Sequence, residues 1–260
     1  MKGSVKYRYL IFDIDDTLFD FGSAYFSAQK NVAALLGVAY TDEFREIDEK
    51  TGWKAWNEMR LDDTDNEEIQ KNYHQRYNNY LKLHYKYLLD EIKVDADLEK
   101  VVACYEESIA SSAEFKEDCT ETVCKDLAKD HKLVLATNGM VTIQEKRIKK
   151  LKPYIHKLFI SEAMGLIKPT KEYYHYILDD LNCRPEECLM IGDSITNDMI
   201  GAKNVGMDVC YYNFKKKEIG DKVVCDYVIN SICELKGMQV IRTDQSNPNP
   251  SSNSVYLFAK

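Results

Sequence analysis

The hydrophobic pattern changes character twice along the chain. An apolar run at residues 5–14 has the length of a buried strand, and residues 19–112 then follow a helical period with no convincing strand among them. Helices are predicted at residues 23–36, closed by Gly37, and at residues 42–59, 67–89 and 95–111. The first 112 residues are therefore predicted to form one strand followed by a helical bundle.

After residue 112, short apolar runs alternate with amphipathic segments. Strands are predicted at residues 132–136, 158–160, 188–191, 209–212 and 223–229. Helices are predicted between them: one opened by a capping box from Thr142 to Glu145, one at residues 170–181 and one ending at Gly206. Strands that alternate with helices predict an α/β fold built on a doubly wound parallel sheet.

The order of these segments predicts how the chain is divided. One strand precedes the helical segment and the others follow it, so the helical segment is predicted to be an insertion. We predict a core of residues 1–18 and 113–240, an all-helical cap of residues 19–112 and a low-complexity tail of residues 241–260. The cap would lie at the carboxyl end of the first strand, where open α/β sheets bind ligands, so we expect it to act as a lid.

Composition limits the location. The chain has 260 residues, of which 45% are hydrophobic, but it has no apolar run of 18 residues, so no membrane span is predicted. The first apolar segment contains acidic residues and does not have the form of a signal peptide. The eight cysteines include no Cys-x-x-Cys pair, and the five histidines show no zinc spacing. We therefore predict that most of the cysteines are ordinary buried thiols in a reducing compartment, and that the location is cytoplasmic.

The charge distribution argues against a nucleic-acid partner. The net charge is −8, and the segment 19–112 holds 19 acidic and 11 basic side chains, which accounts for the whole excess. An acidic face of this kind repels a polynucleotide backbone, so no nucleic acid polymer is expected to bind.

A row of aromatic side chains marks the longest predicted helix. Spacings of four and three place five of them on one face: Tyr73, Tyr77, Tyr80, His84 and Tyr87. We favour a packing stripe inside the bundle over an aromatic wall that faces a substrate.

Carboxylates crowd the end of the first strand. The segment RYLIFDIDDTLFDF places Asp13, Asp15 and Asp16 within four residues, directly after an apolar run. Residues two apart in a strand point the same way, so Asp13 and Asp15 face a common site as the strand ends. Like charges repel at such short range, so a cationic partner is predicted beside them. An Asp-x-Asp pair alone is as consistent with a solvated turn as with a site.

Three further segments carry polar groups to the same edge. Thr137, Asn138 and Gly139 follow a strand and supply donors suited to a phosphate, although a Thr there could simply cap the next helix. Lys168 precedes Pro169, which holds it extended, although a single lysine is usually surface charge. Two more carboxylates, Asp193 and Asp198, follow the strand at 188–191.

The four segments together indicate a metal site. Carboxylate-rich sites with oxygen ligands suit a hard divalent cation, and Mg²⁺ is the ion we expect.

The order and spacing of the four segments resemble the motifs of the haloacid dehalogenase (HAD) superfamily. The matching residues are Asp13-Ile-Asp15-Asp-Thr17, Thr137-Asn-Gly, Lys168-Pro and Gly192-Asp193-Ser-x-x-x-Asp198-x-x-Gly-Ala. The helical insertion after the first motif is similar to the cap of the first subclass. The resemblance covers residues 5–235.

This resemblance implies a catalytic role for each motif residue. Asp13 would attack phosphorus and become an aspartyl-phosphate, and Asp15 would act as the general acid and base. Lys168 would neutralise charge beside Asp13, and Thr137 and Asn138 would bind the phosphoryl group. Mg²⁺ would be held by a set of four aspartates: Asp13, Asp15 through its backbone carbonyl, Asp193 and, through a water or the loop, Asp198. Thr17 would fix the first loop, and Asp16 is expected to be structural or exposed to solvent.

The motifs are most similar to those of bacterial pyrimidine-nucleoside 5′-monophosphate phosphatases. The segments Thr137-Asn-Gly-x-x-x-x-Gln144 and Ser161-Glu-x-x-Gly165-x-x-Lys168-Pro carry that similarity. The implied substrate is a small phosphorylated metabolite. A sugar-phosphate phosphatase such as N-acylneuraminate-9-phosphatase, a phosphomutase and a catalytically inactive ligand-binding protein remain alternatives. Dehalogenases of this superfamily lack the second motif aspartate, and a signalling receiver domain orders its acidic residues differently.

Overall fold

A computed structural model of the chain describes residues 6–218 and 225–238. Its centre is a six-stranded sheet in which every pairing is parallel, with strand order β3-β2-β1-β4-β5-β6. The strands are β1 Tyr9–Phe12, β2 Lys132–Thr137, β3 Ile155–Ile160, β4 Cys188–Gly192, β5 Asp208–Tyr212 and β6 Tyr227–Ile229. The predicted doubly wound α/β fold is confirmed.

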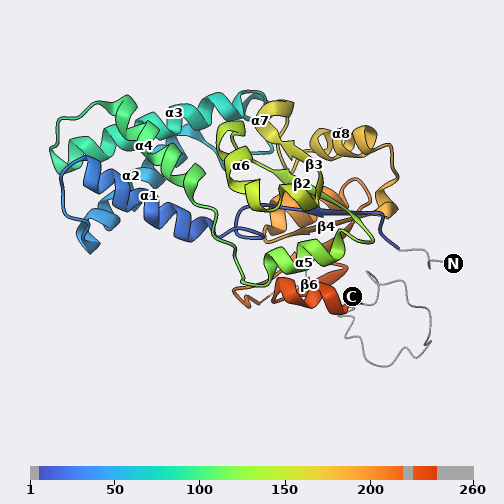
Figure 1. Ribbon diagram of the computed structural model, residues 1–260. Coiled ribbons are helices and arrows are strands. Elements are labelled where there is room, and N and C mark those ends of the chain that lie inside the picture. The colour runs from blue at the N-terminus through green and yellow to red at the C-terminus, as the bar shows by residue number, and fades with distance from the viewer. Residues whose placement is uncertain (1–5, 219–224, 239–260) are drawn as a thin grey trace.

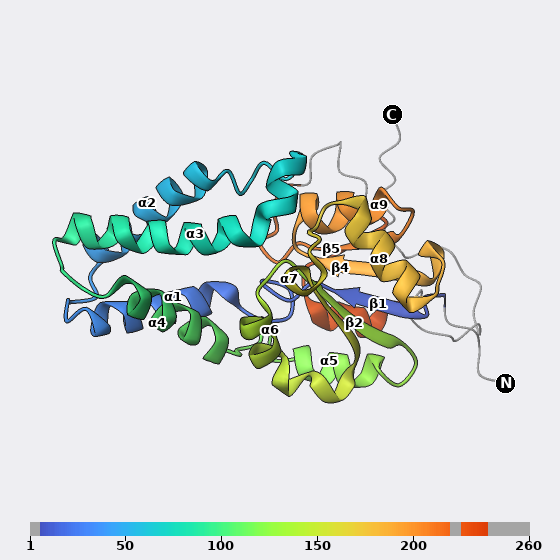
Figure 2. The same cartoon turned by 90° about the horizontal axis from the view of Figure 1, so that it is seen from above.

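Each face of the sheet has its own buried core, because successive strand residues point to opposite faces. Leu10 and Phe12 pack with α5 (Thr120–Leu127) and the short helix η5 (Ile232–Gly237). Tyr9 and Ile11 pack on the other face with α8 (Lys171–Leu181) and α9 (Gly201–Lys203). Figures 1 and 2 show these helices on the two sides of the sheet. The remaining short helices are α6 Val141–Arg147, α7 Ser161–Met164, η1 Ile148–Lys150, η2 Lys152–Tyr154, η3 Pro185–Glu187 and the π-helical turn η4 Ile195–Ile200.

Four helices form a separate bundle at one end of the sheet (Figure 1). They are α1 Phe21–Leu35, α2 Asp42–Met59, α3 Glu67–Ile92 and α4 Leu98–Ser111. A polar side chain caps the N-terminus of each helix, and the capping residues are Asp20, Thr41, Asn66 and Asp97. The bundle has its own hydrophobic core. No described helix is both long and apolar enough to cross a membrane.

The two segments that join the bundle to the sheet run side by side. Phe19 pairs with Phe115 in an antiparallel bridge, the Asp20 N–H donates to Glu114 O at 3.0 Å, and the Lys116 N–H donates to Leu18 O at 2.9 Å. Lys116 Nζ also lies 2.8 Å from Asp16 Oδ1, so Asp16 has a structural ion pair. The bundle therefore leaves and returns to the sheet through one paired ribbon.

Several predicted boundaries differ from the structure. The capping box from Thr142 to Glu145 is wrong, because α6 has no side-chain cap of its own; Glu162 Oε2 instead accepts the Val141 N–H at 2.7 Å. Strand β3 begins at Ile155, three residues before the predicted start, and α5 was not predicted. The predicted first residues of two strands, Val5 and Val223, and the tail at 241–260 lie outside the described residues.

The aromatic face of α3 is half-buried at its tyrosines and fully buried at His84. Tyr77 and Tyr80 pack against the core of the bundle, and His84 is buried with its Nε2 3.1 Å from Asp48 Oδ1. Tyr87 is the partial exception, since its hydroxyl donates to the exposed Glu58. These contacts support the packing interpretation of the stripe.

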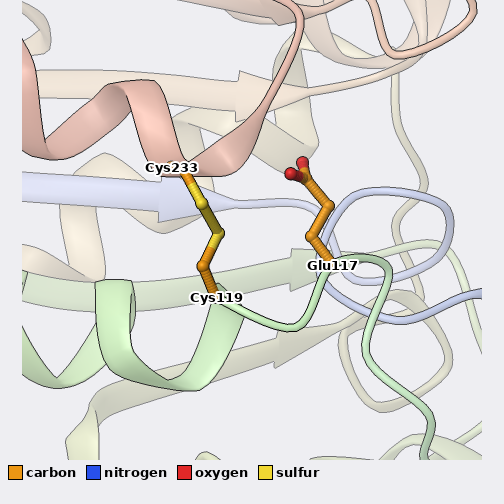
Figure 3. A group of neighbouring side chains, drawn as sticks. All are labelled: Glu117, Cys119 and Cys233. Carbon is orange, nitrogen blue, oxygen red and sulfur yellow. A yellow bond between two sulfur atoms is a disulfide. The ribbon is translucent and has the colours of Figure 1, made fainter.

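One pair of cysteines departs from the predicted free thiols. Cys119 and Cys233 form a disulfide, shown in Figure 3, between residues 114 apart in sequence. The other six cysteines are free thiols, as predicted. Disulfides are typical of oxidising compartments, so this pair counts against a cytoplasmic location, which stays a prediction.

Candidate active site

The carboxyl ends of three neighbouring strands supply most of the predicted site residues. Asp13 directly follows β1, Thr137 ends β2 and Asp193 follows β4. Because β1 lies between β2 and β4, these residues arrive at one edge of the sheet. The Asp13 N–H donates to Ile191 O at 2.9 Å, which extends the pairing of β1 and β4 to the first site residue.

A buried lysine joins two of the carboxylates. Lys168 Nζ lies 2.5 Å from Asp13 Oδ1 and 2.7 Å from Asp198 Oδ1, and it donates to Ala136 O at 3.1 Å. Burial alone would lower the pKa of Lys168, but the charges of Asp13 and Asp198 raise it well above its usual value. Lys168 is therefore a fixed positive charge directly beside Asp13.

Asp193 completes a group of carboxylates. Oxygen atoms of Asp13, Asp193 and Asp198 lie within 4.8 Å of one another. Burial, followed by the charges of the other aspartates, raises the pKa of Asp193 to about 7. Thr17 Oγ1 lies 3.5 Å from Asp13 Oδ2 and 3.4 Å from Asp193 Oδ1, so it bridges the two loops.

This donor set fits a hard divalent cation. Buried carboxylates that repel one another are stabilised by a cation bound between them, and oxygen ligands suit Mg²⁺. Asp13 and Asp193 are the natural direct ligands. Asp198 is already engaged, since Lys168 donates to its Oδ1 and the Ser194 N–H donates to its Oδ2 at 3.1 Å.

Asp15 is held by two side chains of α6. Gln144 Nε2 donates to Asp15 Oδ2 at 2.6 Å, and Arg147 Nη1 forms an ion pair with Asp15 Oδ1. Arg147 is fully buried and also donates from Nε to Ser112 O at 3.1 Å. Its guanidinium lies over the rings of Phe19 and Phe21, at 5.6 and 6.0 Å. One arginine thus contacts Asp15 and both segments that lead into the bundle.

Thr137 and Asn138 have different surroundings. The Thr137 hydroxyl is buried and accepts a hydrogen bond from Gln144 Nε2 at 3.3 Å. The Asn138 side chain is paired twice with the backbone of Lys168, since Nδ2 donates to Lys168 O at 2.9 Å and Oδ1 accepts the Lys168 N–H at 2.8 Å. This side chain positions the lysine, so the predicted phosphate contact of Asn138 is left to its backbone N–H.

Sequence reasoning missed Arg147 and gave Gln144 no role. The two residues are three apart on α6, so they share a helix face, and a charged residue among the apolar positions of that face was the available signal.

A second group of metal-type side chains does not form a site. Glu117 lies beside Cys119 and Cys233, but the two sulfur atoms are bonded to each other (Figure 3). The Glu117 carboxylate accepts hydrogen bonds from the Tyr212 hydroxyl at 2.6 Å, the Ser231 hydroxyl at 2.5 Å and the Ile232 N–H at 2.7 Å. Among the described residues, the aspartates around Lys168 are thus the group whose oxygen atoms remain available to a metal ion.

The comparisons with known proteins agree with this geometry. The family model described as haloacid dehalogenase-like hydrolase matches residues 7–206. The chain belongs to this family. A structure of the HAD-hydrolase YfnB from Bacillus subtilis, described as bound to magnesium and as revealing interdomain movement, superposes with a TM-score of 0.75 at 25% identity. The superposition covers 89% of this chain and 98% of the YfnB chain.

Two relatives are named as a nucleotidase and a phosphatase. This HAD-like hydrolase is 27% identical to the pyrimidine 5′-nucleotidase PynA of Streptococcus pneumoniae, over 80% of this chain and 84% of the relative. It is 24% identical to the N-acylneuraminate-9-phosphatase of Mus musculus, over 91% of this chain and 95% of the relative. Neither alignment leaves out more than 20% of this chain, which is less than the helical bundle, so each includes at least part of the bundle as well as the sheet.

Proposed function

We propose that this HAD-family hydrolase is a Mg²⁺-dependent phosphomonoesterase that works through an aspartyl-phosphate intermediate. The observation that supports it most directly is the buried contact of Lys168 Nζ with Asp13 Oδ1 at 2.5 Å, beside Asp193 and Asp198. A nucleophilic carboxylate must be ionised and must approach a phosphate that is itself negative. Lys168 supplies the positive charge for both needs.

The first step forms a bond between an Asp13 oxygen and phosphorus while the bond from phosphorus to the leaving oxygen breaks. Lys168, Thr137 and the backbone N–H of Asn138 would stabilise the charge on the phosphoryl oxygens. Mg²⁺, held by Asp13, the Asp15 carbonyl and Asp193, would neutralise the remaining charge when bound. Water then attacks the aspartyl-phosphate, which releases phosphate and restores Asp13.

Asp15 would handle the protons of both steps. It gives a proton to the leaving oxygen, and the carboxylate that results takes one from the attacking water. In the structure both Asp15 oxygens accept hydrogen bonds, from Gln144 and Arg147, which is the state suited to the base role. Asp15 therefore has to exchange a partner before it donates a proton.

We assign residues 1–18 and 113–240 to the catalytic core and residues 19–112 to a cap. The cap would exclude water from the reacting groups and contact the leaving group. The site edge and the bundle are joined by the paired ribbon at Phe19 and Phe115, which suits a hinge.

The substrate we propose is a small phosphorylated metabolite, with a nucleoside 5′-monophosphate as the first candidate. The similarity to PynA supports this choice, and the similarity to N-acylneuraminate-9-phosphatase keeps a sugar phosphate as the second. The inactive alternative would be favoured by loss of Asp13, Asp15 or Lys168, and all three are present.

The test is hydrolysis by the purified protein of an aryl phosphate and of a panel of nucleotides and sugar phosphates. We expect activity with Mg²⁺, none with a chelator, and a loss of at least about 10³-fold for Asp13→Asn because the nucleophile is gone. Rates across the panel identify the substrate class. Full activity of Asp13→Asn, or activity that resists the chelator, would refute the mechanism.

A further inference from the structure

One cap residue contacts the segment that follows β3, next to the loop that follows β2. His74, in the second turn of α3, lies with its Nε2 2.8 Å from Ser161 Oγ, the first residue of α7. Figure 1 shows this end of α3 next to α7. Within residues 6–218 and 225–238, this is the one hydrogen bond that joins α2 or α3 to the sheet and its helices.

Ser161 is fully buried and holds the loop in turn. Its hydroxyl accepts the Gly139 N–H at 3.0 Å, and the neighbouring Glu162 accepts the Val141 N–H at 2.7 Å. The loop is tight here, since a Cβ at Gly139 would lie 2.8 Å from Gln144 Nε2. That same Gln144 nitrogen contacts Asp15 and Thr137. His74 is therefore two hydrogen bonds from a loop that touches the reacting groups.

The other side of the bundle is attached in a different way. Lys146 Nζ lies 2.5 Å from Glu107 Oε2, and Met140 and Ile143 of the core belong to the hydrophobic cluster of the bundle. This broad contact lies between α4 and α6, close to the paired ribbon. The layer of α2 and α3 makes far fewer contacts with the core. It is therefore the part of the bundle that a hinge motion can separate from the core.

We propose that His74 is a positioning residue, which the cap places on Ser161, and so indirectly on the loop after β2, when it closes over a bound phosphate. Closure would bring His74 onto Ser161, fix the Ser161 hydroxyl on the Gly139 N–H, and so hold the loop in the shape that receives the phosphoryl group. This inference rests on the proposed phosphatase function. It adds that cap closure and phosphate binding are coupled through one side-chain pair.

The test compares kcat/KM for His74→Ala, His74→Gln and Ser161→Ala, with His175→Ala as the control at an exposed histidine of α8. One net hydrogen bond corresponds to a factor of about 2 to 12. We expect a loss of about fivefold in His74→Ala, carried mainly by KM, substantial recovery in His74→Gln, and no change in His175→Ala. In the Ser161→Ala background, His74→Ala should have no further effect, because the partner is already gone.

A second measurement separates this inference from the proposed function. Small-angle X-ray scattering with Mg²⁺ and vanadate should show a compaction in the wild type that is smaller in His74→Ala. If the wild type hydrolyses no phosphate monoester, the proposed function fails, and the scattering comparison still decides on His74. Independent, multiplicative losses for His74→Ala and Ser161→Ala, or equal compaction in wild type and His74→Ala, would overturn the inference.

Discussion

Arg147 connects the site to both segments that join the bundle to the sheet, which we call the cap linkers. It pairs with Asp15 and contacts the linkers at Ser112, Phe19 and Phe21. Burial lowers the pKa of Arg147 to about 10, so the guanidinium stays charged at neutral pH. We expect Arg147→Met to misplace Asp15. An alkyl phosphate needs a proton on its leaving oxygen and an aryl phosphate does not. The kcat/KM for a nucleoside 5′-monophosphate should therefore fall by at least about tenfold, and that for an aryl phosphate much less.

Arg147→Lys is the matched variant, because it keeps the positive charge but has a single nitrogen in place of the fork. It should retain more activity on the alkyl phosphate than Arg147→Met. An equal loss on both substrates, with a lowered melting temperature, would mean that Arg147 only supports the fold.

At the residue scale, the sequence predicted which side chains meet but not how they pair. Asp13, Lys168 and Asp193 could be expected together, because parallel strands deliver their carboxyl ends to one edge. The pairing of Asn138 with the Lys168 backbone and of Arg147 with Asp15 depends on where α6 and the lysine loop lie in space. No local pattern in the chain encodes those distances.

At the element scale, the helical bundle depends on a buried polar pair. Asp48 on α2 contacts His84 on α3 and accepts hydrogen bonds from Gln29 Nε2 and the Tyr25 hydroxyl, both at 2.8 Å. Burial would raise the pKa of Asp48, but the interaction with His84, followed by the hydrogen bonds from Gln29 and Tyr25, outweighs it and lowers the pKa below its ordinary 3.8. Asp48→Asn should lower the free energy of unfolding by about 3 kcal/mol at neutral pH.

The pH dependence of that difference follows from the direction of the shift. A carboxyl group with a lowered pKa in the folded state stabilises fully above its unfolded pKa of 3.8 and loses this contribution as the pH falls through the folded value. Denaturant titrations of wild type and Asp48→Asn should therefore differ by a constant amount at neutral pH and converge below about pH 4. The exposed Asp90→Asn is the control, and a difference that persists at low pH would contradict the role of the Asp48 charge.

Element boundaries were predictable where the chain carries its own signals. Helix α2 was predicted to the residue, because Thr41 caps its start and its apolar period is regular. Helix α6 was predicted with a cap of its own, whereas Glu162 of α7 supplies the contact to its first turn from another part of the fold. The order of the six strands was not predicted, because the local pattern of the chain does not determine which strands pair.

At the scale of the whole molecule, the site depends on how the chain closes on itself. The second cap linker runs through Lys116 to α5. Cys119, at the start of α5, is bonded to Cys233 of η5 (Figure 3). Glu117 secures the same junction through Tyr212, Ser231 and Ile232. The linker is thus anchored to the far end of the sheet by two independent contacts.

These two anchors predict different consequences for stability and activity. A disulfide that closes a loop of this length, between residues 114 apart, stabilises a fold by about 4–5 kcal/mol through the entropy of the unfolded chain. Replacing Cys119 and Cys233 together by Ser should lower the free energy of unfolding by about that amount in denaturant titrations. The kcat/KM should be retained, because Glu117 still holds the linker. Cys104→Ser, at a free thiol in the bundle, is the control, and a wild type whose stability is unchanged by a reductant would contradict the disulfide's contribution.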